Sequence, residues 1–187
     1  MQPLRLDVTD PASVTAAATA ASDVTVLVNN ADVLAFGSAL TGDLACFERD
    51  LATNYLGTLR VTRAFAPALE RNAPAVVNIL TLIALAPAGP MAGYSASQAA
   101  AHSITQALRA ELRDREITVL GAYPGSLDTD MLAGVEAPKA PPEGRGRTRR
   151  RRPGRRADHR LPRRRLGQCR IGLGTRGRRA ATPWLPG

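Results

Sequence analysis

The stretch that decides the fold, residues 78–98, reads NILTLIALAPAGPMAGYSASQ. It begins as an apolar run typical of a buried strand. It then passes through a loop rich in Pro and Gly and reaches Tyr94 at the start of a predicted helix. Thr81 lies near the end of the strand, and Gln98 follows Tyr94 by four residues. Because residues four apart share one face of a helix, Tyr94 and Gln98 are predicted to point into the same space.

The flanking sequence alternates apolar, β-branched runs with amphipathic segments. Strands are predicted over residues 4–8, 24–28, 75–80 and 117–122, and helices over residues 11–21, 44–71 and 95–113. The first helix has Asp10 as its expected N-cap and Pro11 at the first helical position. This alternation is typical of a parallel α/β sheet, whose ligands bind at the carboxyl ends of the strands.

The positive charge of the chain is concentrated at its C-terminal end. The 187 residues carry a net charge of +9. Residues 144–187 contain 16 Arg and a single acid, Asp158, whereas residues 1–143 carry a net charge of −6. After Met131 the periodicity stops, and a Pro-rich linker leads to a segment dominated by Arg, Gly and Pro. We therefore expect a folded domain over residues 1–135 and a disordered basic tail over residues 136–187.

The cysteines and the apolar stretches bound the class of protein. Cys46 and Cys169 show neither the spacing of a disulfide framework nor that of a zinc site, so we expect no metal and a cytoplasmic protein. The uncharged residues 73–101 contain several prolines and hydroxyl side chains. This composition favours a buried strand and a site loop over a membrane span.

The central stretch resembles the catalytic segment of the short-chain dehydrogenase/reductase family. In that family a Ser at a strand end, a Tyr, and a Lys four residues after the Tyr serve a nicotinamide cofactor. Further pieces match the family in the same order: Asp7-Val8, Asn29-Asn30-Ala31 at a strand end, Asn54 in the long helix, and Pro124-Gly125 followed by Leu127 and Thr129. The resemblance covers residues 6–131 and implies a Rossmann-like parallel sheet with flanking helices.

The resemblance implies an NAD(P)-dependent oxidoreductase that acts on an alcohol or a carbonyl. Tyr94 would be the acid/base, Thr81 the positioning donor, Asn54 a proton-relay residue, and Gln98 the replacement for the Lys. The cofactor-binding residues implied by the resemblance are Asp7, Val8, Asn29, Asn30, Ala31, Pro124, Gly125, Leu127 and Thr129. The two long helices correspond to the family's dimer and tetramer surfaces, which makes a homo-dimer or tetramer compatible with the resemblance.

The chain departs from the family pattern in several places. Gln98 carries no charge to lower the pKa of Tyr94, which is about 10 for a free tyrosine, so we expect impaired turnover. Asp32 stands where the family has Gly and is expected to crowd or repel a phosphate-bearing ligand. No Gly-rich turn precedes Asp7. We therefore expect an N-terminally incomplete member that lacks the first βαβα portion, leaving the strand over residues 24–28 with an open edge.

An atypical Arg-rich C-terminus leaves a second interpretation open. The alternative is a non-catalytic remnant of the family whose basic tail binds nucleic acid through phosphate charge. Trp184 is the single aromatic residue available there for stacking on bases. The composition is more typical of a disordered segment, or of a frameshifted one, so nucleic acid is not the partner that we expect.

Overall fold

The computed structural model describes residues 3–72, 75–133, 135–136 and 138–141. The chain divides into two units, Met1–Arg147 and Thr148–Gly187, and the second lies outside the described residues. The tail predicted over residues 136–187 therefore falls outside the described part from residue 142 onward.

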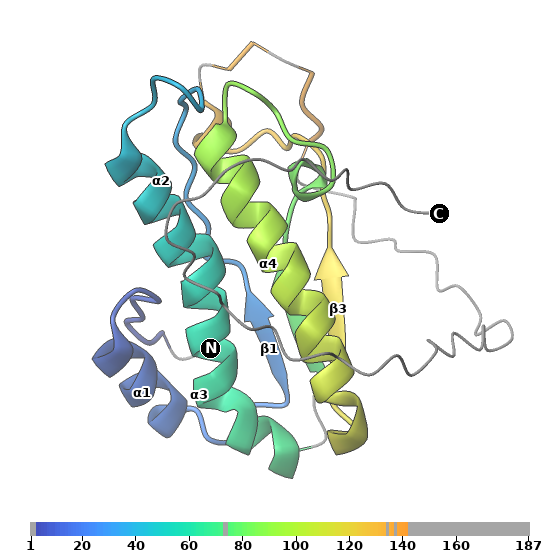
Figure 1. Ribbon diagram of the computed structural model, residues 1–187. Helices are drawn as coiled ribbons and strands as arrows, with labels where there is room; N and C mark the ends of the chain where they lie inside the picture. Colours follow the sequence, from blue (N-terminus) through green and yellow to red (C-terminus); the bar gives the residue numbers. More distant parts are fainter. Residues whose placement is uncertain (1–2, 73–74, 134, 137, 142–187) are drawn as a thin grey trace, which may run out of the picture. The chain divides into compact units, whose positions relative to one another are not determined.

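A three-stranded parallel sheet forms the centre of the first unit (Figure 1). Its strands are β1 (Val26–Asn29), β2 (Ala75–Ile79) and β3 (Thr118–Ala122), in the order β1-β2-β3. The register places Asn29 beside Asn78 and Asn78 beside Gly121. This arrangement confirms the predicted parallel sheet, and β1 forms one of its edges as expected.

The prediction of a strand over residues 4–8 is wrong, because this segment has no regular secondary structure. It is held by the long helix instead of by a strand ladder. The carbonyl of Val8 accepts a hydrogen bond of 2.5 Å from Arg60. A Cβ on Gly57 would lie 2.8 Å from Val8 Cγ2, so only a glycine at this position lets Val8 approach the helix so closely.

The helices follow the predicted pattern with one irregularity. They are α1 (Pro11–Ala20), α2 (Leu44–Asp50), the π-helix η1 (Leu51–Gly57), α3 (Thr58–Arg71) and α4 (Ala92–Glu111). Short 3₁₀ turns are η2 (Leu82–Ala84), η3 (Arg113–Arg115) and η4 (Asp130–Leu132). Asp10 caps α1 by accepting from the amides of Ala12 and Ser13, as predicted. The helix predicted over residues 44–71 is confirmed as the unbroken run of α2, η1 and α3.

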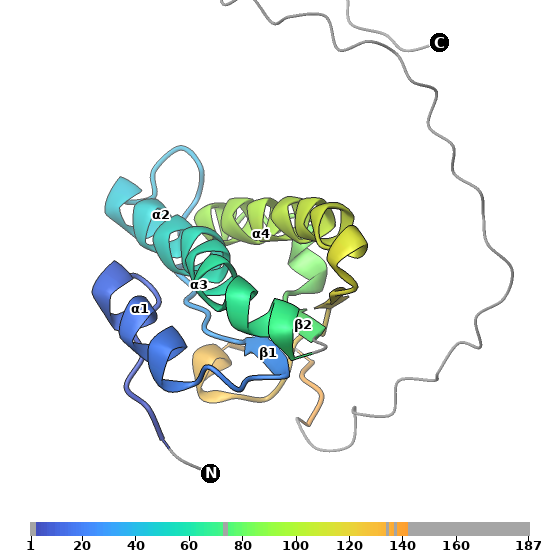
Figure 2. The same ribbon diagram turned by 90° about the horizontal axis from the view of Figure 1, so that it is seen from below.

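Helices α3 and α4 cover the same face of the sheet, and α1 lies beside α3 (Figure 2). The core lies between these layers, and each fully buried apolar side chain contributes about 1.5–3 kcal/mol. The core includes Leu27, Val76 and Val119 from the strands, Phe65 and Leu69 from α3, and Leu108 from α4. On the opposite face Val26, Val28 and Leu120 are 53%, 53% and 51% exposed.

None of the helices in the described part combines the length and the apolar character that a membrane crossing requires.

Candidate active site at the carboxyl ends of the strands

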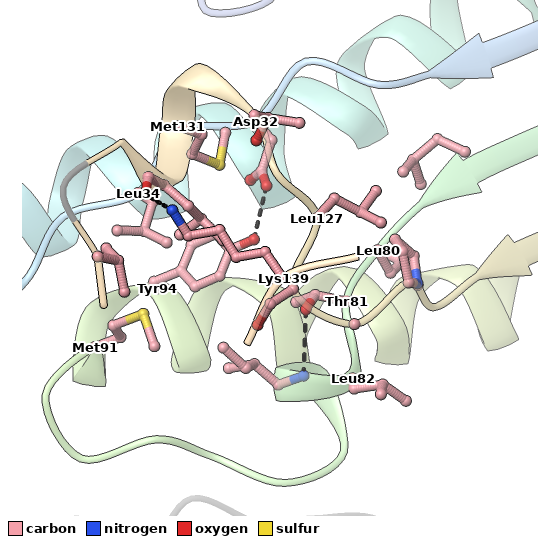
Figure 3. Close-up of a pocket in the computed structure, with 18 of the residues that line it drawn as sticks. Asp32, Leu34, Leu80, Thr81, Leu82, Met91, Tyr94, Leu127, Met131 and Lys139 are labelled. Carbon is pink, nitrogen blue, oxygen red and sulfur yellow. Dashed lines mark hydrogen bonds between the residues drawn. The ribbon is translucent and has the colours of Figure 1, made fainter. Parts of the chain in front are cut away.

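A pocket of about 640 Å³ opens where the three strands end. The loops that follow β1, β2 and β3 form its walls, as expected for the ligand site of a parallel sheet. Most of the lining is apolar, with Leu34, Leu82 and Met131 among the contributors (Figure 3). Its polar groups include the sequence-predicted residues Asn30, Thr81, Tyr94 and Thr129, together with Asp32.

The loop that follows β1 is fixed to the long helix directly after Asp32. Asn54 accepts from the Val33 amide at 2.9 Å and donates to the Val33 carbonyl at 2.8 Å. Two residues on, the amide of Ala35 donates to Asp50 Oδ2 at 3.4 Å. These contacts aim the Asp32 side chain at α4.

The π-helix presents Asn54 to this loop. Asn54 is 3% exposed, and its side-chain amide also donates to Ser97 Oγ at 3.0 Å. The Ser97 hydroxyl in turn donates to the Tyr94 carbonyl at 2.8 Å. Every hydrogen-bonding group of the Asn54 side chain is thus engaged with the protein, and Asn54 does not line the pocket. Asn54 holds the β1 loop and α4 together, and the predicted relay role stays a prediction.

Asp32 joins Tyr94 and Gln98. The Tyr94 hydroxyl donates to Asp32 Oδ2 at 2.7 Å (Figure 3). The Gln98 amide donates to Asp32 Oδ1 at 2.9 Å. Tyr94 and Gln98 therefore share a face of α4, as their spacing predicts. Gln98 is 2% exposed and lies behind Asp32, outside the pocket lining. Both carboxylate oxygens of Asp32 accept hydrogen bonds from α4, which the sequence analysis did not predict. The repulsion of a ligand phosphate by Asp32 stays a prediction.

The protonation of the pair departs from ordinary values. Burial raises the pKa of Asp32, against the opposing effect of the hydrogen bonds from Tyr94, Gln98 and the Val33 amide. Burial, and after it the charge of Asp32, raises the pKa of Tyr94. Asp50 adds a further negative charge that acts on both groups. At neutral pH Tyr94 is therefore a phenol that donates to Asp32.

The start of α4 is brought close to α2 by Gly93. A Cβ on Gly93 would lie 2.9 Å from Cγ of Phe47, so any larger residue would push the two helices apart. The loop before α4 is also paired with the loop after β1, since the Gly37 amide donates to the Pro90 carbonyl at 2.8 Å. These contacts place Tyr94 in the first turn of the helix, on the pocket wall.

Thr81 follows β2 directly and contributes a second hydroxyl to the pocket. Its Oγ1 accepts from the amide of Ile83 at 3.4 Å, which caps the short turn η2. The hydroxyl hydrogen of Thr81 has no acceptor among the described residues, so it is available to a ligand oxygen. The neighbouring loops are held together by the Leu82 amide, which donates to the Pro124 carbonyl at 3.1 Å.

The segment after β3 forms the wall beside Thr81. Four sequence-predicted residues line the pocket here: Pro124, Gly125, Leu127 and Thr129. Leu127 forms a bridge with Ala140 through hydrogen bonds made by its neighbours Ser126 and Asp128. The amide and the carbonyl of Leu127 have no backbone partner in the described part of the chain. One free donor and one free acceptor on a pocket wall match the hydrogen-bonding groups of a carboxamide.

Of the other predicted cofactor residues, Asn30 lines this pocket, whereas Asp7, Val8, Asn29 and Ala31 do not. Asn29 donates to Thr62 Oγ1 at 3.0 Å and to Asn78 Oδ1 at 2.8 Å, so its side chain enters the helix layer. A smaller hollow of about 190 Å³ beside β1 is lined by Val8, Asn29, Asn30 and Ala31, among others. Asp7 is exposed, and its hydrogen bonds with Thr9 hold its pKa below the usual range. The structure thus divides the predicted residues between two hollows.

Two polar interactions were missed by the sequence analysis. The Asp32 contact with Tyr94 joins positions 62 apart, and no local pattern indicates it. The second joins His102 to Tyr123, with His102 Nδ1 lying 2.7 Å from the Tyr123 hydroxyl oxygen. Its ring is edge-on to that of Tyr123.

Comparisons with known proteins agree with this geometry. A family model described as short chain dehydrogenase matches residues 1–140. The 2-(S)-hydroxypropyl-CoM dehydrogenase 3 of Xanthobacter autotrophicus is 35% identical over 65% of this chain and 49% of its own length. The inactive 2-(S)-hydroxypropyl-CoM dehydrogenase 2 of the same organism is 35% identical over 73% of this chain and 62% of its own length.

A similar solved structure is a short chain dehydrogenase from Burkholderia cenocepacia J2315 in complex with NADP. It superposes with a TM-score of 0.71 at 38% sequence identity, over 73% of this chain and 60% of that one. The chain therefore spans between about half and three fifths of the length of these relatives.

Proposed function

Since the chain belongs to the short-chain dehydrogenase family, we propose that its pocket serves an oxidoreductase that transfers a hydride between NAD(P) and an alcohol or carbonyl substrate. The observation that carries this proposal is the presence of two hydroxyl groups, from Thr81 and Tyr94, on the wall of one pocket at the carboxyl ends of the strands. An apolar pocket with few convergent polar groups suits a small organic substrate.

The residues of the pocket fit the nicotinamide end of such a cofactor. The free amide and carbonyl of Leu127 suit its carboxamide, and Pro124, Gly125 and Thr129 would line the ring. The Burkholderia relative was solved with NADP, which supports this class of cofactor. When bound, the cofactor supplies or takes the hydride.

The roles of the protein groups follow from their hydrogen bonds. Tyr94 exchanges a proton with the substrate oxygen, and the Thr81 hydroxyl donates to the same oxygen and holds it in place. Asn54 and Gln98 act from behind the pocket as positioning residues, through the β1 loop and Asp32. The raised pKa of Tyr94 makes its phenolate form rare, so we propose that turnover is impaired.

Titration of NADH and NADPH into the full chain by calorimetry tests the cofactor assignment. Turnover is followed by NAD(P)H absorbance with a panel of secondary alcohols and ketones. Tyr94→Phe should keep dinucleotide binding and lower turnover by about 10²–10⁴-fold, because it removes the acid/base. The matched control, Tyr55→Phe, lies outside the pocket and should leave both unchanged.

The alternative, a non-catalytic family remnant, makes the opposite predictions. A relative named as a dehydrogenase and a relative named as an inactive one are both 35% identical to this chain, so overall similarity does not separate the two cases. Failure to bind either dinucleotide, or equal turnover in wild type and Tyr94→Phe, would favour the remnant. The nucleic-acid role proposed for the basic tail concerns residues outside the described part.

We also propose that the chain associates with itself through its long helices. Leu44, Leu51 and Leu56 are 72%, 36% and 43% exposed along α2 and η1, which favours a covered surface there. Sedimentation velocity of the full chain gives the mass that tests this. The cytoplasmic location expected from the sequence stays a prediction.

A further inference from the structure

The polar groups at the back of the pocket form a connected chain that no family role assigned above explains. Tyr94 faces the pocket and donates to Asp32, and Asp32 is held at its second oxygen by Gln98. The order is pocket, phenol, carboxylate, amide. Two departures from the family pattern, the acid at position 32 and the uncharged residue at position 98, are therefore in direct contact.

We propose that Asp32 is a positioning residue that acts through Tyr94 as the terminal proton acceptor of the site. In alcohol oxidation the substrate hydroxyl gives its proton to Tyr94 Oη, while Tyr94 gives its own proton to Asp32 Oδ2. The oxidised cofactor, when bound, would take the C–H hydride, so the substrate loses one proton from its hydroxyl and one hydride, which carries two electrons, from its carbon. Carbonyl reduction runs the same proton path in reverse. This inference rests on the proposed oxidoreductase function.

The geometry supports this direction of transfer. The Tyr94 hydrogen already points at Asp32 across 2.7 Å, which leaves the phenol oxygen lone pairs to accept a proton from the pocket side. A tyrosine without a neighbouring cation is a weak base by itself. A carboxylate that takes the phenol proton as the substrate proton arrives removes the need for a free phenolate.

The groups around Asp32 keep it suited to this task. From α4 it faces Tyr94 and Gln98, and from α2 the carboxylate of Asp50 acts on it. Burial and Asp50 raise its pKa, so Asp32 takes a proton more readily than an exposed aspartate does. Gln98 fixes Oδ1 without adding a charge, whereas a lysine there would stabilise the carboxylate and weaken it as a base.

The lysine of the pocket wall is engaged elsewhere. Lys139 donates to the Leu132 carbonyl at 2.7 Å and lies 3.8 Å from Asp128. Among the described residues, no cation contributes to the titration of Asp32 or Tyr94. The proton path therefore ends at a carboxylate.

A first test uses the protein without cofactor. Carbon-13 NMR of chain labelled at the aspartate carboxyls, with Asp32→Asn to assign the signal, gives the titration midpoint of Asp32. We expect this midpoint above the usual aspartate range, and Tyr94→Phe should raise it further by removing a donor to the carboxylate. Tyr55→Phe is the control and should not move it. A midpoint in the usual range, or one indifferent to Tyr94→Phe, would overturn the inference.

A second test compares turnover in wild type, Asp32→Gly, Gln98→Lys and the double variant. Asp32→Gly alone should slow alcohol oxidation about 100-fold, since Tyr94 loses its proton acceptor. Gln98→Lys alone should slow it as well, because the lysine pairs with Asp32. The double variant restores the arrangement of Gly and Lys and should recover at least wild-type turnover. Gln98→Lys should thus lower turnover in wild type and raise it in Asp32→Gly. Residues with a purely structural role are not expected to show this reversal.

The pH profile supplies the remaining readout. Wild-type oxidation should rise with pH through the NMR midpoint of Asp32, and carbonyl reduction should fall through the same midpoint. Faster turnover in Asp32→Gly than in wild type would overturn the inference and leave the oxidoreductase function standing. No turnover in any of the four proteins, with dinucleotide bound, would overturn both.

Discussion

At the scale of single residues, Asp50 is a completely buried carboxylate of which one oxygen accepts a hydrogen bond. Oδ2 accepts from the Ala35 amide, and Oδ1 has no partner within the described residues. Burial raises the pKa of Asp50, while the Ala35 hydrogen bond and the Arg49 charge oppose the rise. The folded protein therefore holds this proton more tightly than the unfolded chain. Its contribution to stability is present at low pH and is lost as pH rises through the raised pKa.

Asp50→Asn should accordingly stabilise the protein at pH 8 by about 1 kcal/mol, because a neutral group of the same shape replaces an incompletely paired buried charge. The gain should shrink as the pH is lowered, because wild-type Asp50 then takes up a proton and becomes neutral itself. Urea unfolding at several pH values measures both effects. Asp23→Asn, at an exposed position, is the control and should change stability equally little at every pH. A gain that does not depend on pH would contradict this account.

The residue contacts of the site were only partly predictable from the sequence. The shared face of Tyr94 and Gln98 follows from helical periodicity alone. The position of Asp32 does not, because it depends on a loop fixed at Val33 by Asn54, a contact between positions 21 apart. The sequence gives the charge of Asp32 but does not tell which way its side chain points. The sequence analysis therefore expected Asp32 to repel a ligand, and it did not predict that Asp32 accepts hydrogen bonds from Tyr94 and Gln98 of α4.

At the scale of elements, a buried polar ladder connects the sheet to the helices. Asn78, which is fully buried in β2, accepts from Asn29 of β1 at 2.8 Å and donates to Thr105 of α4 at 2.8 Å. The register of parallel strands places the two asparagines side by side. The ladder therefore fixes the sheet to α4, the helix that carries Tyr94.

Asn78→Ala should destabilise the protein by about 2–4 kcal/mol, because it removes one buried hydrogen bond from each of Asn29 and Thr105 and opens a cavity. Asn30→Ala, at an exposed position just after β1, should cost less than about 0.5 kcal/mol. Urea denaturation of both variants measures the difference. Equal costs would show that the ladder does not stabilise the contact between sheet and helix.

The elements themselves were predicted well where periodicity is strong and poorly where it is short. The helix over residues 44–71 follows from apolar positions three or four apart. Its π-helical centre does not, because η1 leaves the apolar face continuous and reveals itself only in the contacts of Asn54. Residues 4–8 have strand-like composition, yet in the structure they lie against α3 and η1, where Arg60 and Gly57 hold Val8. A run of five residues carries too little information to decide between these arrangements.

At the scale of the whole molecule, the described helices cover one face of the sheet. Leu27, 8% exposed, faces the core, while its neighbour Val28 is 53% exposed on the opposite face. Parallel sheets are usually covered on both faces, so the two faces of this one should differ sharply in their contribution to stability. The alternation of side chains along β1 gives a direct way to measure that difference.

Leu27→Thr should destabilise the folded chain by about 2–4 kcal/mol, because it removes a buried side chain from the contact of β1 with α3 and places a hydroxyl there. Val28→Thr introduces the same new side chain at the adjacent position. Because threonine suits a strand about as well as valine does, this variant should cost less than about 1 kcal/mol. Urea unfolding of the full chain gives both values under one set of conditions. Both variants lie in β1 and both introduce threonine, so the difference between their unfolding free energies reports which face of the sheet is covered. Similar costs at the two positions would mean that the face carrying Val28 is packed in solution, and that stability is shared between both sides of the sheet.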